Sequence, residues 1–175
     1  RESALTKYRE VASKFPNTGA AILARLGEGS LLLDKKDADG ALSAFNDVKN
    51  SALAKADAEV RGRAIEGIGF ANELKAAATP ADAPKYLDAA ISAYKDLENN
   101  VSARGFKELA LYHQARCHEA KGEKDKAKEL LVDVQKRMNE AGSGHPFPYL
   151  QEVAIDRLRA IDPSLVQAPM RMPGA

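Results

Sequence analysis

Residues 111–134 constrain the fold more than any other part of the chain. They read as two helices joined by a tight turn at Gly122. Apolar residues recur three and four positions apart on both sides of this turn, which is the spacing of one helix face. The small side chains of Ala115 and Ala127 allow two antiparallel backbones to approach closely. The segment therefore predicts a helical hairpin.

The same hairpin pattern recurs upstream. Gly29 and Ala41 are twelve residues apart, the same separation as between the two alanines of the first hairpin. A further copy has Gly67 before its turn and Ala90 after it, and these are 23 residues apart, which is eleven more. Eleven residues make about three helical turns, so we expect both helices of this hairpin to lengthen and to project beyond their neighbours.

The opening residues repeat only the second half of the unit, with Ala4, Tyr8 and Val11 in the pattern, so we expect the sequence to begin inside a repeat. Pro16 ends the first helix, because proline disfavours helical geometry at the residue before it. Helical spacing and turn residues together predict eight helices, at residues 2–15, 20–35, 37–49, 56–77, 86–99, 102–120, 124–140 and 148–161.

Glycines are unusually frequent inside the predicted helices, and each costs about 1 kcal/mol of helix stability relative to alanine. They are Gly27 and Gly29 in one helix and Gly62, Gly67 and Gly69 in another. Such a cost is reasonable where another helix crosses closely. We therefore expect Gly67→Leu to destabilise the protein through overpacking.

The order of residue types in these hairpins resembles a tetratricopeptide repeat: a small residue, a large one three positions later, a turn, then alanine, a large apolar residue and a small apolar one. The resemblance implies an all-α, right-handed α-solenoid of about eight helices, in which neighbouring antiparallel hairpins share a continuous core. We expect one repeat domain over residues 1–161, ending in a capping helix. Residues 162–175 are rich in proline and are expected to form a flexible tail.

Composition excludes several classes of function. Charged residues make up 29% of the chain and the formal net charge is +1, so no overall field attracts nucleic acid. The single cysteine excludes an internal disulfide. No run approaches the roughly 18 apolar residues of a membrane span, and no signal peptide is visible, although an anchor can precede a sequence that begins inside a repeat.

The only cluster of metal-ligating residue types is His113, Cys117 and His118. A zinc site needs three or four ligands, and we interpret these residues as packing residues rather than as a metal site. Cys117 lies in the middle of a helix without an evident base, and the glycines follow no phosphate-binding pattern. We expect no enzyme, metal or cofactor; the alternative is an enzyme subunit that uses His113 and Cys117.

The resemblance implies that the first helix of each hairpin lines a concave groove that binds other proteins or peptides, although some matching residues are expected in the core. Heat-shock chaperone tails are unlikely ligands, because family members that bind them use Lys and Asn where this chain has Leu26, Ser30, Ala64 and Ile68. The matching positions are Leu23, Leu26, Ser30, Leu33, Arg61, Ala64, Ile68, Asn72, Leu109, Tyr112, Arg116 and Glu119.

Residues 8–18, followed by Ala24-Arg25-Leu26-Gly27, resemble a repeat junction of bacterial envelope proteins. Over residues 4–161 the chain is similar to the periplasmic domain of YfgM-like ancillary subunits of the SecYEG translocon. This implies a periplasmic adaptor, anchored in the inner membrane, that binds translocon components, chaperones or emerging polypeptides. The alternative is a lipoprotein scaffold of outer-membrane assembly or the cell wall. A span of about 20 apolar residues ahead of Arg1 would favour the first, and a lipoprotein signal the second.

Overall fold

A computed structural model describes residues 2–165 of the protein, and this part is all-helical. Short 3₁₀ helices at Pro80–Asp82, Gly142–Gly144 and Pro163–Leu165 complete the described part. Of the expected flexible tail, residues 166–175 lie outside the described residues. The α-helices are α1 (Glu2–Lys14), α2 (Gly19–Asp34), α3 (Ala38–Lys49), α4 (Ala52–Ala56), α5 (Ala58–Ala78), α6 (Ala83–Asn100), α7 (Phe106–Ala120), α8 (Lys124–Ala141) and α9 (Tyr149–Ile161).

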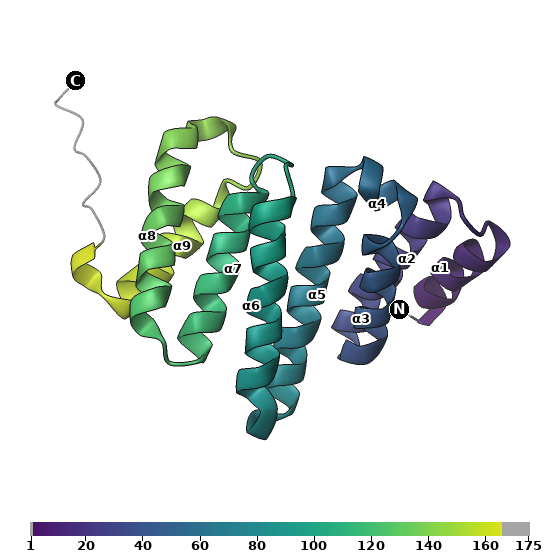
Figure 1. Ribbon diagram of the computed structural model, residues 1–175, viewed down its shortest axis with the longest axis horizontal. Helices are drawn as coiled ribbons and strands as arrows, with labels where there is room; N and C mark the ends of the chain where they lie inside the picture. The colour runs from purple at the N-terminus through teal and green to yellow at the C-terminus, as the bar shows by residue number, and fades with distance from the viewer. Residues whose placement is uncertain (1, 166–175) are drawn as a thin grey trace.

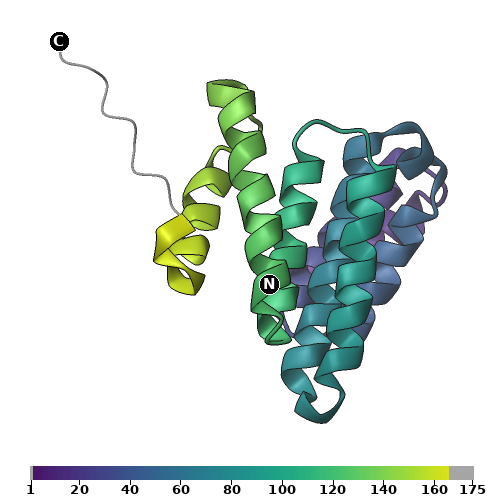
Figure 2. The same ribbon diagram turned by 60° about the vertical axis from the view of Figure 1, so that its left-hand side comes forward.

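The helices stand side by side in a row that runs from α1 at one end to α9 at the other (Figure 1). Three antiparallel hairpins, α2–α3, α5–α6 and α7–α8, form the middle of the row, and each packs on the next. The expected α-solenoid is therefore confirmed. The α5–α6 hairpin projects beyond its neighbours at one edge, as its expanded sequence predicts (Figure 2).

Side-chain caps and turn conformations explain where these helices begin and end. Thr18 accepts a hydrogen bond from the Ala21 amide at 3.1 Å, and Asp37 accepts one from the Gly40 amide at 2.9 Å. Each cap satisfies an amide that the first helical turn would leave unpaired. In the turn after α7, Gly122 has a φ of 79°, a left-handed conformation that suits glycine.

The structure has nine α-helices over the described residues, where we expected about eight. The additional helix, α4, begins after Ser51, whose hydroxyl accepts from the Ala54 amide at 3.1 Å. It ends at Ala56, and the next residue, Asp57, caps the start of α5. A five-residue helix is too short to show a helical period, so only its two capping residues could have revealed it.

Aromatic rings packed on glycines hold the helices together, and the close crossings expected at the helical glycines are confirmed. A Cβ atom added at any of these glycines would lie only 2.2–2.7 Å from the nearest ring atom, closer than van der Waals contact allows. The rings therefore sit directly on bare helix backbone. The pairs are Tyr8 on Gly27, Phe45 on Gly29 and Gly67, Tyr94 on Gly69, and Phe106 on Gly62.

These pairs correct the register that we assigned to α5. Phe45 packs on Gly29 in its own hairpin, and Tyr94 packs on Gly69 in its own hairpin. Gly69, rather than Gly67, is therefore the equivalent of Gly29. Gly69 and Ala90 are 21 residues apart, against twelve in the regular hairpins, so the expansion is nine residues rather than eleven.

Substitution at Gly67 tests this packing. Phe45 is almost fully buried and is held between Gly29 and Gly67, so its ring has no room to retreat from a new methyl group. We expect Gly67→Ala to lower the free energy of unfolding by about 1–3 kcal/mol, and Gly67→Leu by still more. Urea titrations would measure both changes.

Gly19→Ala is the matched control, because a Cβ there would meet only Leu53 at an ordinary 3.9 Å. We expect this variant to be unchanged, or more stable by up to about 1 kcal/mol, since alanine is the better helix former. Equal stability of the Gly67→Ala and Gly19→Ala proteins would contradict the packing described above.

Candidate functional site: the inner face

The row of helices has an inner side formed by the first helix of each hairpin. The backbones of these first helices approach one another from hairpin to hairpin: α2 approaches α5, α5 approaches α7, and α7 approaches α9. The second helices are spaced more widely, and Lys49 of α3 reaches across to Asp96 of α6 with an N–O distance of 2.6 Å. The first helices therefore line the inner face.

Arg116 of α7 lies at the centre of the candidate site. Its guanidinium carbon is 5.6 Å from the ring centre of Phe70 in α5 and 5.9 Å from that of Tyr112. The same guanidinium donates to both carboxylate oxygens of Glu73, at 2.5 and 2.6 Å. Arg116 thus joins α5 to α7 by an ion pair and by cation–π contacts.

Arg157 of α9 makes a second contact of this kind with Tyr112. Its guanidinium carbon is 5.8 Å from the ring centre of Tyr112, and it donates to Glu119 at 2.5 Å. Tyr112 therefore contacts two arginines from two different helices. Its ring remains partly exposed, as does that of Phe70.

Arg63 of α5 forms the third such centre. Its guanidinium carbon is 5.1 Å from the ring centres of both Phe106 and Phe147, and it donates to Glu66 at 3.0 Å. We call the set of residues with these contacts the arginine–aromatic cluster. It consists of Arg63, Glu66, Phe70, Glu73, Phe106, Tyr112, Arg116, Glu119, Phe147 and Arg157.

A buried polar layer lies behind the cluster. His113 Nε2 is 3.1 Å from Glu66 Oε1, and the His113 ring packs 5.0 Å from that of Phe70 and 4.8 Å from that of Tyr94. Burial lowers the pKa of His113 despite the neighbouring carboxylate. Burial alone would raise the pKa of Glu66, but hydrogen bonds from His113 and Arg63 bring it below the ordinary value. His113 is thus held neutral against an ionised Glu66.

The predicted groove residues divide by helix. In α7, Tyr112, Arg116 and Glu119 lie in the cluster, whereas Leu109 is fully buried in the core. In α2, Leu23 is 51% exposed and Ser30 is also exposed. The remaining two predicted residues of α2, Leu26 and Leu33, are half-buried.

The four predicted residues of α5 are not brought into the cluster. Ala64 is fully buried, Asn72 is buried and donates its side-chain amide to the Ile68 carbonyl, and Ile68 packs against the core of α1–α3. Arg61 lies near Asp96 of α6 and contributes to lowering the pKa of that carboxyl. The cause is the two-residue error in register.

Moving Arg61, Ala64 and Ile68 by two residues gives Arg63, Glu66 and Phe70, three of the four α5 members of the cluster. The same shift takes Asn72 to Leu74, which is next to the fourth member, Glu73. The sequence did contain a signal for this register, because glycine also stands at position 69. Only the contact with Tyr94 shows which glycine is equivalent to Gly29. Arg157 was missed because we interpreted its helix as a cap rather than as part of the inner face.

His113 and Cys117 show no arrangement for nucleophilic chemistry. Cys117 is fully buried, and burial together with the charge of Glu73 raises the pKa of its thiol to about 12. A thiol with such a pKa stays protonated at neutral pH and is a poor nucleophile. Among residues 2–165, no group of three or more His, Cys, Asp or Glu side chains is placed to hold a metal ion.

A family model for the tetratricopeptide repeat matches residues 109–137, which lie in α7 and α8. The α7–α8 hairpin is therefore a tetratricopeptide repeat, and the chain contains at least this one. No curated protein and no solved structure matches the chain. Within residues 2–165, none of the helices combines the length and the apolar character needed to cross a bilayer.

The buried His113 should make the protein less stable in mild acid. Its pKa in the folded protein is below the ordinary 6.5, so the unfolded chain binds a proton first as the pH falls. Between pH 7 and 5, protonation of His113 in the unfolded chain lowers the free energy of unfolding by at most about 1.4 kcal/mol per pH unit. Glu66 adds little to the loss in this range, because its carboxyl has the ordinary pKa of 4.5 in the unfolded chain and stays mostly ionised in both states down to pH 5.

Urea titrations at pH 7 and pH 5 would measure this loss. We expect His113→Gln, which does not titrate, to lose less stability than the wild-type protein between the two pH values. An equal loss in both proteins would mean that His113 is not held neutral.

Proposed function

We propose that the protein is a non-catalytic interaction scaffold that binds another polypeptide through its inner face. Tetratricopeptide repeats generally mediate protein–protein interactions. The observation that carries the proposal is the arginine–aromatic cluster, in which the partly exposed Phe70 and Tyr112 pack against the guanidinium groups of Arg116 and Arg157. Arginine and aromatic side chains are enriched among the residues that contribute most to binding energy.

The charge of the cluster indicates the kind of contact that a partner makes. Its three arginines are each paired with a glutamate, so the cluster has no net charge. A strongly charged partner would have to break these pairs. Further along the inner face, α2 offers Leu23 at 51% exposure. The partner is therefore held by apolar and aromatic contacts, with polar groups at the edges.

We further propose that this scaffold acts in the bacterial cell envelope. The resemblance of residues 8–18 and the Ala24-Arg25-Leu26-Gly27 stretch to envelope proteins supports this placement. The full-length protein is then anchored in the inner membrane with its repeats in the periplasm, and it is associated with protein translocation or with periplasmic chaperones. The alternative placement is a lipoprotein scaffold of outer-membrane assembly or of the cell wall.

Site-specific crosslinking tests the binding face. A photoreactive amino acid replaces Phe70 or Tyr112 in the full-length protein, and irradiated membranes are examined for adducts by mass spectrometry. We expect the same partner to be captured from both positions, because both side chains contact the guanidinium group of Arg116.

Two control positions make this experiment decisive. Ser92 is exposed on α6, a second helix, and should capture nothing specific. Arg61 lies on α5 near Asp96, outside the cluster, and should also fail. Capture from Arg61 or Ser92, but from neither Phe70 nor Tyr112, would show that the partner does not bind the inner face.

Cell fractionation of the full-length protein tests the placement in the envelope. We expect it in the inner-membrane fraction, with repeats that a protease reaches once the outer membrane is permeabilised. Recovery in the outer-membrane fraction would instead support the lipoprotein scaffold. Recovery only in the cytoplasm would exclude both.

A further inference from the structure

One face of α1 carries an apolar stripe that the helices of residues 2–165 cover only in part, where the ring of Tyr8 rests on Gly27 of α2. The stripe consists of Ala4, Tyr8 and Val11 of α1 and of Phe15, which directly follows the helix and continues its last turn. These residues are four, three and four positions apart and so share one side of the helix. Tyr8 is 37% exposed and Phe15 is 55% exposed. We call these four residues the α1 stripe.

The equivalent residues of the three complete hairpins provide an internal comparison. In the second helix of each hairpin, an alanine is followed by a large residue four positions later and by a smaller apolar residue three positions after that. Ala4, Tyr8 and Val11 occupy these three positions in α1. In the complete hairpins, every residue at these positions is at most 2% exposed. These residues are Ala41, Phe45 and Val48 in α3, Ala90, Tyr94 and Leu97 in α6, and Ala127, Leu131 and Val134 in α8.

The first helix of each hairpin provides this cover, and it does so with a small residue. Gly29 of α2 lies under Phe45, and Gly69 of α5 lies under Tyr94. Ala115 stands at the same position in α7, twelve residues before Ala127. A helix that covers the α1 stripe therefore needs glycine or alanine where it crosses Tyr8.

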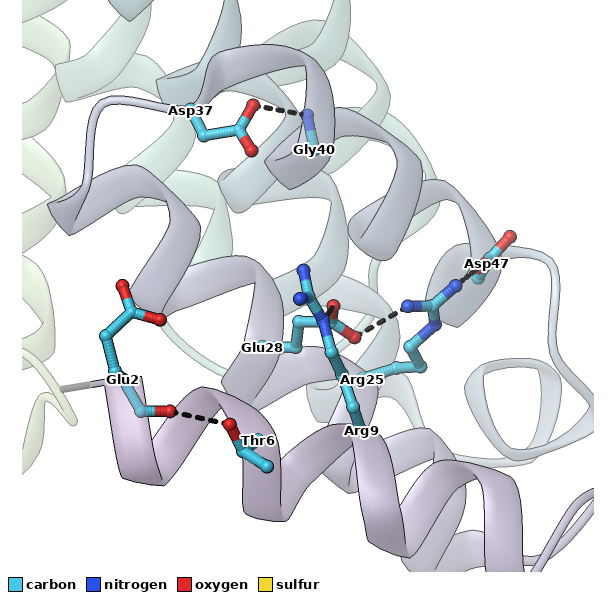
Figure 3. A network of polar contacts seen from close by, with 8 residues as sticks. All are labelled: Glu2, Thr6, Arg9, Arg25, Glu28, Asp37, Gly40 and Asp47. Atoms are coloured by element: carbon cyan, nitrogen blue, oxygen red, sulfur yellow. Dashed lines mark hydrogen bonds and ion pairs between the residues drawn. The ribbon is translucent and has the colours of Figure 1, made fainter.

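The α1 helix is held firmly in place beneath its exposed stripe. Leu5 is buried in the core of the first hairpin, and the ring of Tyr8 rests on Gly27 of α2. Arg9 pairs with the buried carboxylate of Glu28 at 2.8 Å, and Arg25 binds the same carboxylate at 2.6 Å (Figure 3). The stripe is thus a preformed surface on a fixed helix.

The far end of the row, in a second copy of the chain, does not offer a matching surface. The outward side of α9, at the other end of the row, presents the exposed charged residues Glu152, Asp156 and Arg159. Burying these against Tyr8 and Phe15 would remove charges from water without partners.

We propose that an amphipathic helix packs antiparallel on the α1 stripe, with glycine or alanine twelve positions ahead of Ala4, and that the polypeptide directly ahead of Arg1 supplies it. In the α2–α3 and α7–α8 hairpins, the covering helix comes first and is joined by three residues, 35–37 and 121–123. The helix completes a further hairpin and adds one helix to the inner face, beside α2.

Thiol labelling tests this proposal, with Ala4→Cys placed in the 175-residue chain and in the natural full-length protein. Native Cys117 gives no background, since it is buried and its pKa is about 12. We expect a maleimide to label the introduced thiol at least about tenfold more slowly in the full-length protein, because labelling then requires local opening.

Ser13→Cys is the control, because Ser13 is exposed outside the stripe and should be labelled equally in both proteins. Equal labelling of Ala4→Cys in the two proteins would overturn the proposal. Protection that increases with the concentration of the 175-residue chain would also overturn it, because a second copy would then cover the stripe.

A graft tests whether the stripe accepts such a helix. A copy of residues 106–123 is fused directly ahead of Arg1, which places the copied Ala115 twelve positions before Ala4. We expect the Tm to rise by several degrees, and the same graft with Ala115→Asp in the copy to lose that rise. The same Tm with and without the graft would contradict the proposal that the α1 stripe accepts a helix with a small residue where it crosses Tyr8.

Discussion

Direct contact between aromatic rings and bare helix backbone is the interaction on which the rest of this structure depends. Each glycine lowers the stability of its helix by about 1 kcal/mol relative to alanine. The absence of a Cβ atom allows an aromatic ring to pack directly on the helix backbone. Phe45 is held between Gly29 of its own hairpin and Gly67 of the next. Because one ring contacts two hairpins, the same contact sets both the closeness of the helices and the rotation of α5 about its axis.

That rotation decides which residues face a partner. With Gly69 under Tyr94, α5 turns Phe70 toward Arg116 of α7 and brings Glu73 within hydrogen-bonding distance of the same guanidinium. Tyr94 also donates to Glu73 at 2.5 Å, so the ring that fixes the register helps to orient the site. The inner face is therefore a consequence of core packing, and the binding proposal rests on it.

The sequence predicted the hairpins well because their signal is local and repeated. Twelve residues between Gly29 and Ala41, and again between Ala115 and Ala127, predict two equivalent turns without any tertiary information. It did not predict α4, which is too short to show a helical period. The α5 register was also missed, since glycine at both 67 and 69 allows two alignments that differ by about 200° in direction. The α7 residues Tyr112, Arg116 and Glu119 were placed on the inner face because their repeat is regular.

A double-mutant cycle between Gly69 and Tyr94 tests the central claim most directly. The free energy of unfolding is measured for Gly69→Ala, Tyr94→Ala and the double variant, and a second cycle pairs Gly67→Ala with Tyr94→Ala. The account predicts that Gly69 and Tyr94 are coupled by about 1 kcal/mol or more, while Gly67 and Tyr94 are additive within about 0.5 kcal/mol. Coupling of Tyr94 to Gly67 and additivity with Gly69 would contradict the register and the inner face built on it.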